Sequence, residues 1–103
     1  MLKIIDGKRY NTETATEVAS RQHGFGGDFD RFNESLYRTP KGAGFVAGSG
    51  GPNSPYAQAV DINSRTGGEG LRPLSDEQAM AWLENNDETD ALDQYFAEAI
   101  EDA

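Results

Sequence analysis

The stretch from residue 75 to residue 103 contains no Lys or Arg, and this constrains the fold more than any other feature of the sequence. It contains ten acidic residues: Asp76, Glu77, Glu84, Asp87, Glu88, Asp90, Asp93, Glu98, Glu101 and Asp102. An acidic stretch stays disordered unless it carries enough apolar residues to pack. Here apolar residues recur at the spacing of a helix face, namely Leu92, Tyr95, Phe96, Ala99 and Ile100. The pattern predicts a folded, helical segment with an apolar face rather than a shapeless tail.

The start of this segment carries a helix signal. Ser75 followed by Gln78 predicts a capping box, in which each side chain bonds the other residue's backbone N–H. We therefore expect a helix over residues 76–86, with Ala79, Trp82 and Leu83 on one face. A second helix should begin at Asp87 or Thr89.

The N-terminal part is a mixture of hairpin and helix signals. Residues 2–10 flank Asp6-Gly7, a dipeptide that favours a two-residue hairpin turn. Asn11 can cap a helix over residues 12–21 that ends before Gly24, which places His23 near a helix C-terminus. Residues 31–48 alternate around the turn sequence TPKGA and predict a second hairpin.

Residues 49–70 are rich in Gly and Pro and predict a long surface loop, after which residues 71–73 can add a short third strand. Taken together, the segments predict one α+β domain over residues 1–103. It has a small antiparallel β-sheet, an N-terminal hairpin and helix, and two acidic C-terminal helices within 75–103. The expected core is Ile5, Val18, Phe32, Leu36, Phe45, Leu74, Trp82, Leu83, Leu92 and Phe96.

Charge and composition exclude several classes of function. The net charge is −9, yet residues 1–74 carry all nine bases against eight acids and are nearly neutral. Nucleic acid is therefore excluded as a direct ligand of the acidic segment, because such binding needs Lys and Arg to displace counterions. The chain has no cysteine, and no apolar run approaches the length of a membrane span. We expect a cytoplasmic protein that does not contact a membrane.

No motif for catalysis, metal binding or a cofactor is present. The glycines of GAGFVAGSGGP lack the Lys and the spacing of a phosphate-binding loop. The acids around residues 87–93 lack the central Gly of a calcium loop. His23 is the only histidine, and the serines have no nucleophile signature. We predict no catalytic residues, no metal site and no cofactor.

Three segments are similar to a widespread family of short, mostly uncharacterised bacterial and mobile-element proteins. They are KIIDGKRYNTETATEVAS, ESLYRTPKGAGFVAGSGGPNSPYA and RPLSDEQAMAWLE. The family shows Lys-Ile-Ile-x-Gly-Lys-x-Tyr, then Leu-Tyr-x-Thr-x-x-Gly, Gly-x-Gly-Gly-Pro-x-Ser-x-Tyr and Pro-Leu-Ser-x-x-x-Ala-x-x-Trp-Leu. The resemblance covers most of residues 2–84 and implies a phage or mobile-element context that includes anti-CRISPR inhibitors. It implies no catalytic role.

The first functional hypothesis is a non-enzymatic, anti-CRISPR-like inhibitor that acts as a DNA mimic. Its acidic surface would occupy a basic nucleic-acid-binding site of a CRISPR-Cas effector or another bacterial defence complex in the host cytoplasm. The predicted partner-binding residues are Glu84, Asp87, Glu88, Asp90, Asp93, Glu98 and Glu101, together with Tyr56. The alternatives are an adaptor or antitoxin-like regulator that binds through Tyr56 and the loop 49–70, and a small hydrolase built on His23.

Overall fold

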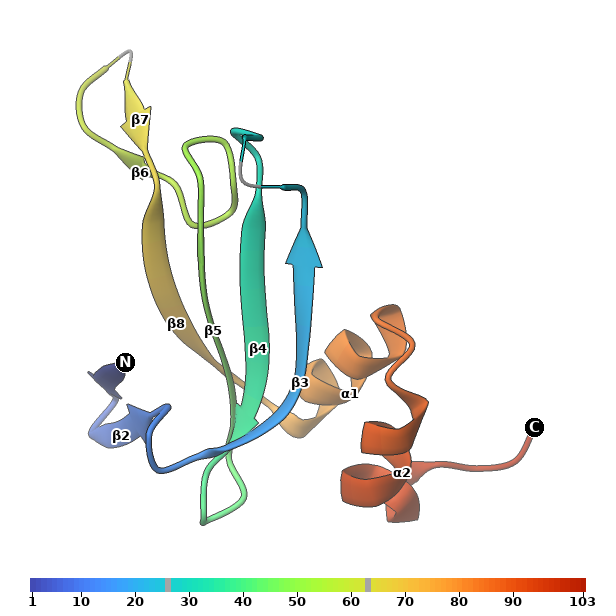
Figure 1. The fold of residues 1–103 in the computed structure, drawn as a ribbon. Helices are drawn as coiled ribbons and strands as arrows, with labels where there is room; N and C mark the ends of the chain where they lie inside the picture. Colours follow the sequence, from blue (N-terminus) through green and yellow to red (C-terminus); the bar gives the residue numbers. More distant parts are fainter. Residues whose placement is uncertain (26, 63) are drawn as a thin grey trace.

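The protein, described by a computed structural model over residues 1–25, 27–62 and 64–103, is built on a four-stranded antiparallel sheet (Figure 1). The strands lie in the order β3-β4-β5-β8, with bounds β3 Thr16–His23, β4 Phe32–Arg38, β5 Gly44–Gly50 and β8 Gly68–Leu74. The two small hairpins are β1 Leu2–Ile5 with β2 Lys8–Asn11, and β6 Gln58–Ala59 with β7 Arg65–Thr66. The helices are α1 Asp76–Asn85, α2 Thr89–Phe96 and the short 3-10 helix η1 Ala97–Ala99. The predicted α+β class is confirmed.

The helix predicted over residues 12–21 is wrong, because this segment enters strand β3. Asn11 still caps locally: its Oδ1 accepts from the backbone N–H of Glu13 at 2.9 Å, but a turn follows instead of a helix. The β-branched residues of TETATEV favour a strand wherever a partner strand is available. That partner is β4, which pairs from Thr16 opposite Arg38 to His23 opposite Phe32, with a bulge near Val18.

Both predicted hairpins are confirmed. In the first, Asp6 and Gly7 have φ angles of 52° and 76°, the left-handed values that a tight hairpin turn requires. The second consists of β4 and β5, paired from Phe32 opposite Gly50 to Arg38 opposite Gly44. The first hairpin lies near the lower end of the large sheet in Figure 1.

The third strand is longer than predicted. β8 spans seven residues, and it pairs with β5 along its whole length. Pro73 is tolerated there because β8 is an edge strand, where one side needs no ladder hydrogen bond. The remainder of the predicted loop 49–70 contains the β6–β7 hairpin, and its Asn63 lies outside the described residues.

Two apolar clusters lie on opposite faces of the sheet. The first joins Leu36 and Val46 of the sheet to α1 and α2 through Leu74, Ala79, Trp82, Leu83 and Ala91. The second lies against the N-terminal hairpin and consists of Tyr10, Phe45, Ala47 and Leu71. Of the predicted core, five residues are buried: Leu36, Phe45, Leu74, Trp82 and Leu83. The other five are partly buried: Ile5, Val18, Phe32, Leu92 and Phe96.

The predicted helices are confirmed with one correction. Ser75 and Gln78 form the capping box, with Gln78 N donating to Ser75 Oγ at 3.1 Å and Ser75 N to Gln78 Oε1 at 2.9 Å. The second helix begins at Thr89. Its apolar face is shorter than predicted, because Ala99 is exposed and Ile100 is 43% exposed. Among the described residues, no helix has both the length and the apolar character that crossing a membrane would need.

The connection between α1 and α2 yields a prediction of stability. Asp87 follows the C-cap Asn86 with φ 55°, while Glu88 N donates to Leu83 O at 2.9 Å and Asp87 N to Glu84 O at 3.2 Å. This is a Schellman motif, in which glycine suits the left-handed position best. Asp87 also places a negative charge near the negative end of α1. Asp87→Gly should therefore raise the free energy of unfolding by about 1 kcal/mol, measured by urea denaturation.

The matched control is Asp90→Gly, which places glycine within the first turn of α2. It removes the same charge but lowers helix propensity and loses a favourable dipole contact, so it should destabilise by about 1 kcal/mol. Equal effects of the two substitutions would contradict the view that the left-handed conformation of Asp87 is unfavourable for a residue other than glycine.

Candidate functional site

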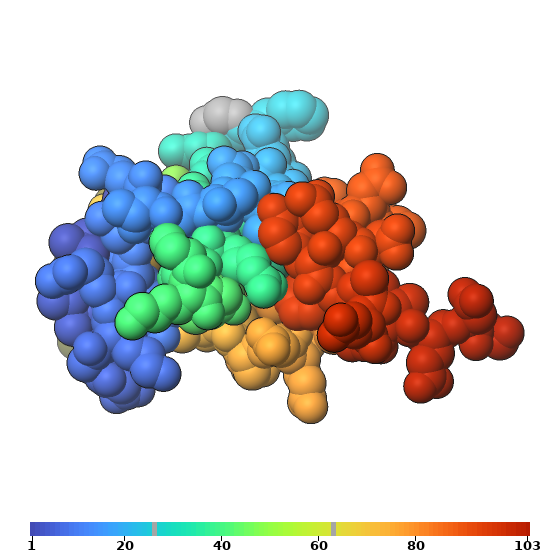
Figure 2. Space-filling view, turned by 90° about the horizontal axis from the view of Figure 1, so that it is seen from below, coloured from blue at the N-terminus to red at the C-terminus, as the bar shows by residue number. Residues whose placement is uncertain are grey.

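The predicted partner-binding acids lie on one structural unit, formed by α1, α2, η1 and the residues that follow. Figure 2 shows this unit to one side of the sheet, with the C-terminal residues reaching away from the body. Six of the seven predicted acids in this unit are exposed: Glu84, Asp87, Asp90, Asp93, Glu98 and Glu101. Glu88 is partly buried at the N-cap of α2, where its side chain makes no capping hydrogen bond.

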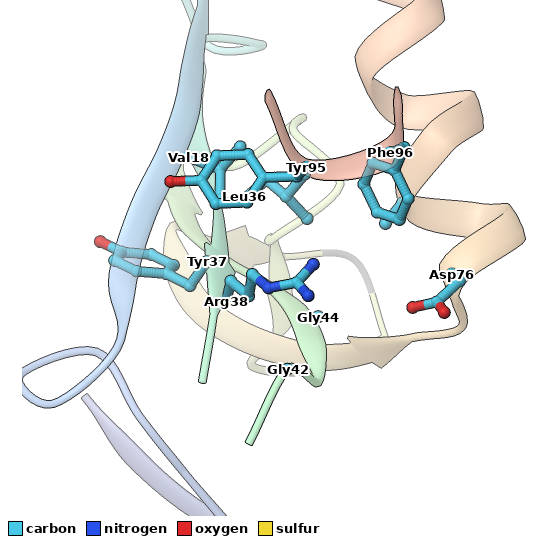
Figure 3. A pocket seen from close by; sticks show the side chains of 10 residues that line it. Val18, Leu36, Tyr37, Arg38, Gly42, Gly44, Asp76, Tyr95 and Phe96 are labelled. Atoms are coloured by element: carbon cyan, nitrogen blue, oxygen red, sulfur yellow. The ribbon is translucent and has the colours of Figure 1, made fainter. Parts of the chain in front are cut away.

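The acidic unit is held against the sheet by apolar contacts. Trp82 and Leu83 of α1 are buried against Leu36 and Val46, and Phe96 of α2 packs on the same cluster. Figure 3 shows Tyr95 and Phe96 together with Val18, Leu36 and Arg38 around the space between α2 and the sheet. That space is a cavity of only about 10 Å³, no larger than one water molecule needs. The acids are thus carried on an ordered support.

Few cations reach this unit from the body. The Arg38 guanidinium lies 5.5 Å from the centre of the Tyr95 ring, and Arg21 Nη1 donates to Asn86 Oδ1 at 3.5 Å. Within the described part of the chain, none of the ten acids of residues 75–103 forms an ion pair. Their charge is therefore not neutralised by the protein itself.

Tyr56, the remaining predicted contact residue, is tied to the body rather than free in the loop. Its hydroxyl donates to Glu34 Oε2 at 2.6 Å. Its ring lies over strand positions where only glycine leaves room, since a Cβ on Gly48 would come 2.6 Å from the hydroxyl oxygen. A Cβ on Gly70 would come 3.3 Å from the ring. The glycines of β5 and β8 thus let the loop fold back onto the sheet.

Glu34 is the centre of a buried hydrogen-bond network that the sequence analysis did not predict. Its side chain accepts from Arg21 Nε and Trp82 Nε1, both at 2.9 Å, and from the Tyr56 hydroxyl. Glu34 is 6% exposed although it carries a charge. Its position in the alternating pattern of FNESLYR, two residues before Leu36 and on the same face, was the available signal.

The protonation states of Glu34 and Tyr56 follow from their burial and their hydrogen bonds. Burial raises the pKa of the Glu34 carboxyl, but the hydrogen bonds from Tyr56 and Trp82 and the charge of Arg21 outweigh burial, so that the pKa lies below its ordinary value. Burial and the Glu34 carboxylate raise the pKa of the Tyr56 hydroxyl. Tyr56 is therefore a neutral donor and Glu34 an ionised acceptor at neutral pH.

His23 lies in a different setting from the one predicted. It ends strand β3 instead of a helix, stacks on the Phe32 ring at 5.3 Å, and places Nε2 3.2 Å from Asp30 Oδ2. It borders an open hollow of about 250 Å³ that is also lined by Ser49. His23 and Asp30 are both well exposed, so this pair lacks the buried, oriented setting of a catalytic dyad.

Metal binding has no support in the described ranges. They contain no group of three or more His, Cys, Asp or Glu side chains placed to hold a metal ion. The oxygens of the buried Glu34 instead accept hydrogen bonds from nitrogen and hydroxyl donors.

The fit of Tyr56 over the sheet leads to a second prediction. In Gly48→Ala the new Cβ would overlap the Asn33 carbonyl oxygen and the Tyr56 hydroxyl. We expect a loss of about 1–3 kcal/mol in the free energy of unfolding, because neither group can move without breaking its hydrogen bonds. Gly27→Ala, whose Cβ would meet no atom within 4 Å, is the control and should change stability by less than about 0.5 kcal/mol. Equal stability of the two variants would disprove the tight fit.

The third prediction concerns the Glu34 carboxylate. Glu34→Gln replaces one acceptor oxygen with a donor and removes the charge, so one of three surrounding donors loses its partner. The free energy of unfolding at pH 7 should fall by about 2–3 kcal/mol. Because folding lowers this pKa, the stabilisation is full above the unfolded value near 4.5 and is lost as pH falls below it.

Urea denaturation of both proteins between pH 7 and pH 3 measures this effect. The difference between wild type and Glu34→Gln should shrink as the pH falls through this range. The exposed Glu69, mutated to Gln, is the control and should show almost no effect at any pH. A difference that is independent of pH would refute the charged role of Glu34.

Comparisons with protein-family models, with curated proteins and with solved structures found no match for this chain. The resemblance to small bacterial and mobile-element proteins stays a prediction.

Proposed function

We propose that this protein is a non-enzymatic inhibitor that binds a basic protein surface through its acidic unit, residues 75–103. The observation that carries the proposal is the unneutralised charge of that unit. Ten acids lie on or beside its helices, nine of them are exposed, and no Lys or Arg lies in the segment.

This charge arrangement costs stability in the free protein. Exposed helices commonly gain a few tenths of a kcal/mol from each Glu–Lys pair four residues apart, and like charges cost a similar amount. The chain forgoes these pairs throughout α1 and α2. A cost of this kind is repaid on binding, when the carboxylates meet a surface rich in Lys and Arg.

The ordered support strengthens the proposal. Because Trp82, Leu83 and Phe96 anchor the helices, the carboxylates keep fixed positions relative to the sheet. A fixed negative surface steers a basic partner into one orientation and speeds association. A nucleic-acid channel lined with Lys and Arg has the complementary chemistry, since carboxylates can replace phosphates there.

We infer that the partner is a nucleic-acid-binding complex of bacterial defence, such as a CRISPR-Cas effector. The chemistry of such channels and the resemblance of residues 2–84 to mobile-element proteins support this choice. Inhibition would be competitive: the protein occupies the channel, and DNA is excluded.

A second candidate is an adaptor that binds through the loop 49–70. The observation in its favour is the pair Val60 and Ile62, which are 65% and 98% exposed near the β6–β7 hairpin. Salt separates the two mechanisms, because screening weakens a charge interface far more than an apolar one.

The fourth prediction uses charge reversal on the acidic unit. Asp93→Lys combined with Glu98→Lys changes two exposed acids and leaves the apolar contacts intact. Immobilised protein should capture nucleic-acid-binding proteins from a bacterial lysate at about 50 mM salt, and double-stranded DNA should displace them. The double variant should lose about tenfold or more of this capture.

The matched control is Glu13→Lys combined with Glu69→Lys, which makes the same charge change on the sheet body. It should retain capture. If both variants lose capture equally, net charge alone is responsible and the directed surface is rejected. Capture that survives about 500 mM salt and the Asp93/Glu98 reversal would favour the loop mechanism.

A further inference from the structure

A second surface feature, separate from the acidic unit, is a hollow beside the Glu34 network. It measures about 310 Å³ and is lined by Arg21, Glu34, Pro55, Tyr56, Gly70 and Arg72. Its size lies at the lower end of the range for small-molecule sites, roughly 300–1,000 Å³. The acidic unit, residues 75–103, contributes none of its lining residues.

The strand register explains why the hollow exists. Arg21 pairs opposite Glu34, Glu34 opposite Gly48, and Gly48 opposite Gly70. The two glycines leave this part of the face of β5 and β8 without side chains, and the Tyr56 ring lies beside them. Arg72 follows Gly70 by two residues and therefore lies on the same face.

The charges around the hollow do not cancel. Arg21 donates its Nε to Glu34 and its Nη1 to Asn86 Oδ1 at 3.5 Å, and its side chain is still 41% exposed. Among residues 1–25, 27–62 and 64–103, no carboxylate lies within ion-pair distance of Arg72. Burial and Glu34 raise the pKa of the Tyr56 hydroxyl, and the charges of Arg72 and Arg21 oppose this only in part. The hollow is thus lined by two cations and one carboxylate, with the Tyr56 ring as part of its wall.

We propose that this hollow binds a small organic phosphate, with the phosphate at Arg21 and Arg72 and its apolar part against Tyr56 and Pro55. A guanidinium presents paired N–H donors that match phosphate oxygens, and it binds them bidentately. A dianion is favoured over a single carboxylate because two guanidiniums face it and Glu34 neutralises only one charge. Lys8, Arg9 and Lys41 line a separate hollow that also includes Tyr10, so a control variant in that hollow is needed.

The single tryptophan provides the measurement. Trp82 donates to the same Glu34 oxygen that accepts from Arg21, so an anion that engages Arg21 changes the environment of the indole. We would titrate the protein with phenyl phosphate, and separately with inorganic phosphate, at constant ionic strength maintained with NaCl. The fluorescence change should saturate with both, and phenyl phosphate should bind more tightly.

Arg72→Gln is the decisive variant, because Arg72 is exposed and makes no ion pair with the described residues that the fold would lose. Its affinity for phenyl phosphate should fall about tenfold or more, the size expected when a charge-assisted hydrogen bond is lost. Arg9→Gln removes the same charge from strand β2, in the N-terminal hairpin, and should bind as wild type does. Thermal unfolding checks that both variants are folded.

A change that does not saturate, or equal affinity in wild type and Arg72→Gln, would overturn the proposal. If Arg9→Gln weakens the binding of phenyl phosphate as much as Arg72→Gln does, the binding is a general attraction between charges, and the proposal is overturned too. If Arg72→Gln fails to fold, amide chemical shifts of the wild type decide the question. Shifts centred on Tyr56, Gly70 and Arg72 support the site, and shifts centred on the N-terminal hairpin refute it.

Discussion

The buried carboxylate of Glu34 is the interaction on which the rest of the structure depends. Its two oxygens accept from Arg21 on the edge strand, Tyr56 in the loop and Trp82 in α1. These donors come from parts of the chain far apart in sequence, so one group fixes the sheet edge, the loop and the helix relative to one another. A buried charge without partners would be costly, and three donors remove most of that cost. No buried polar side-chain atom in the described residues lacks a hydrogen-bond partner.

Glycine makes this network possible. Glu34 lies opposite Gly48, and Gly48 opposite Gly70, so the Tyr56 ring can lie on the sheet and reach the carboxylate. The same absence of side chains leaves the hollow beside Arg72. The glycines of β5 and β8 therefore have two consequences. The loop packs on the sheet, and an open hollow remains that we propose binds an anion. The Gly-rich segment lacks a phosphate-loop motif. Its glycines instead make room for Tyr56 to pack on the sheet.

The two sides of the molecule differ in electrostatic character. The sheet body carries all the basic residues and is close to neutral, whereas α1, α2 and the residues after them carry only acids. Trp82 connects the two, because its ring packs in the core while its N–H bonds Glu34. The acidic unit is thereby held in place by apolar burial, by this hydrogen bond and by the one from Arg21 Nη1 to Asn86 Oδ1. A fixed negative surface on a near-neutral body is the physical basis for the inhibitory function that we propose.

The sequence by itself determined the local elements whose signals lie within a few residues. These are the hairpin turn at Asp6-Gly7, the β4–β5 hairpin, the capping box at Ser75 and the two C-terminal helices. It failed for residues 16–23, where helical and strand signals compete and only pairing with β4 decides between them. The alternation of FNESLYR places Glu34 on the same strand face as Leu36, but it could not show that the carboxylate is buried, because a lone acid in a strand is usually exposed. Only the tertiary structure brought Arg21, Tyr56 and Trp82 to that carboxylate, since their contacts span 13, 22 and 48 residues of sequence.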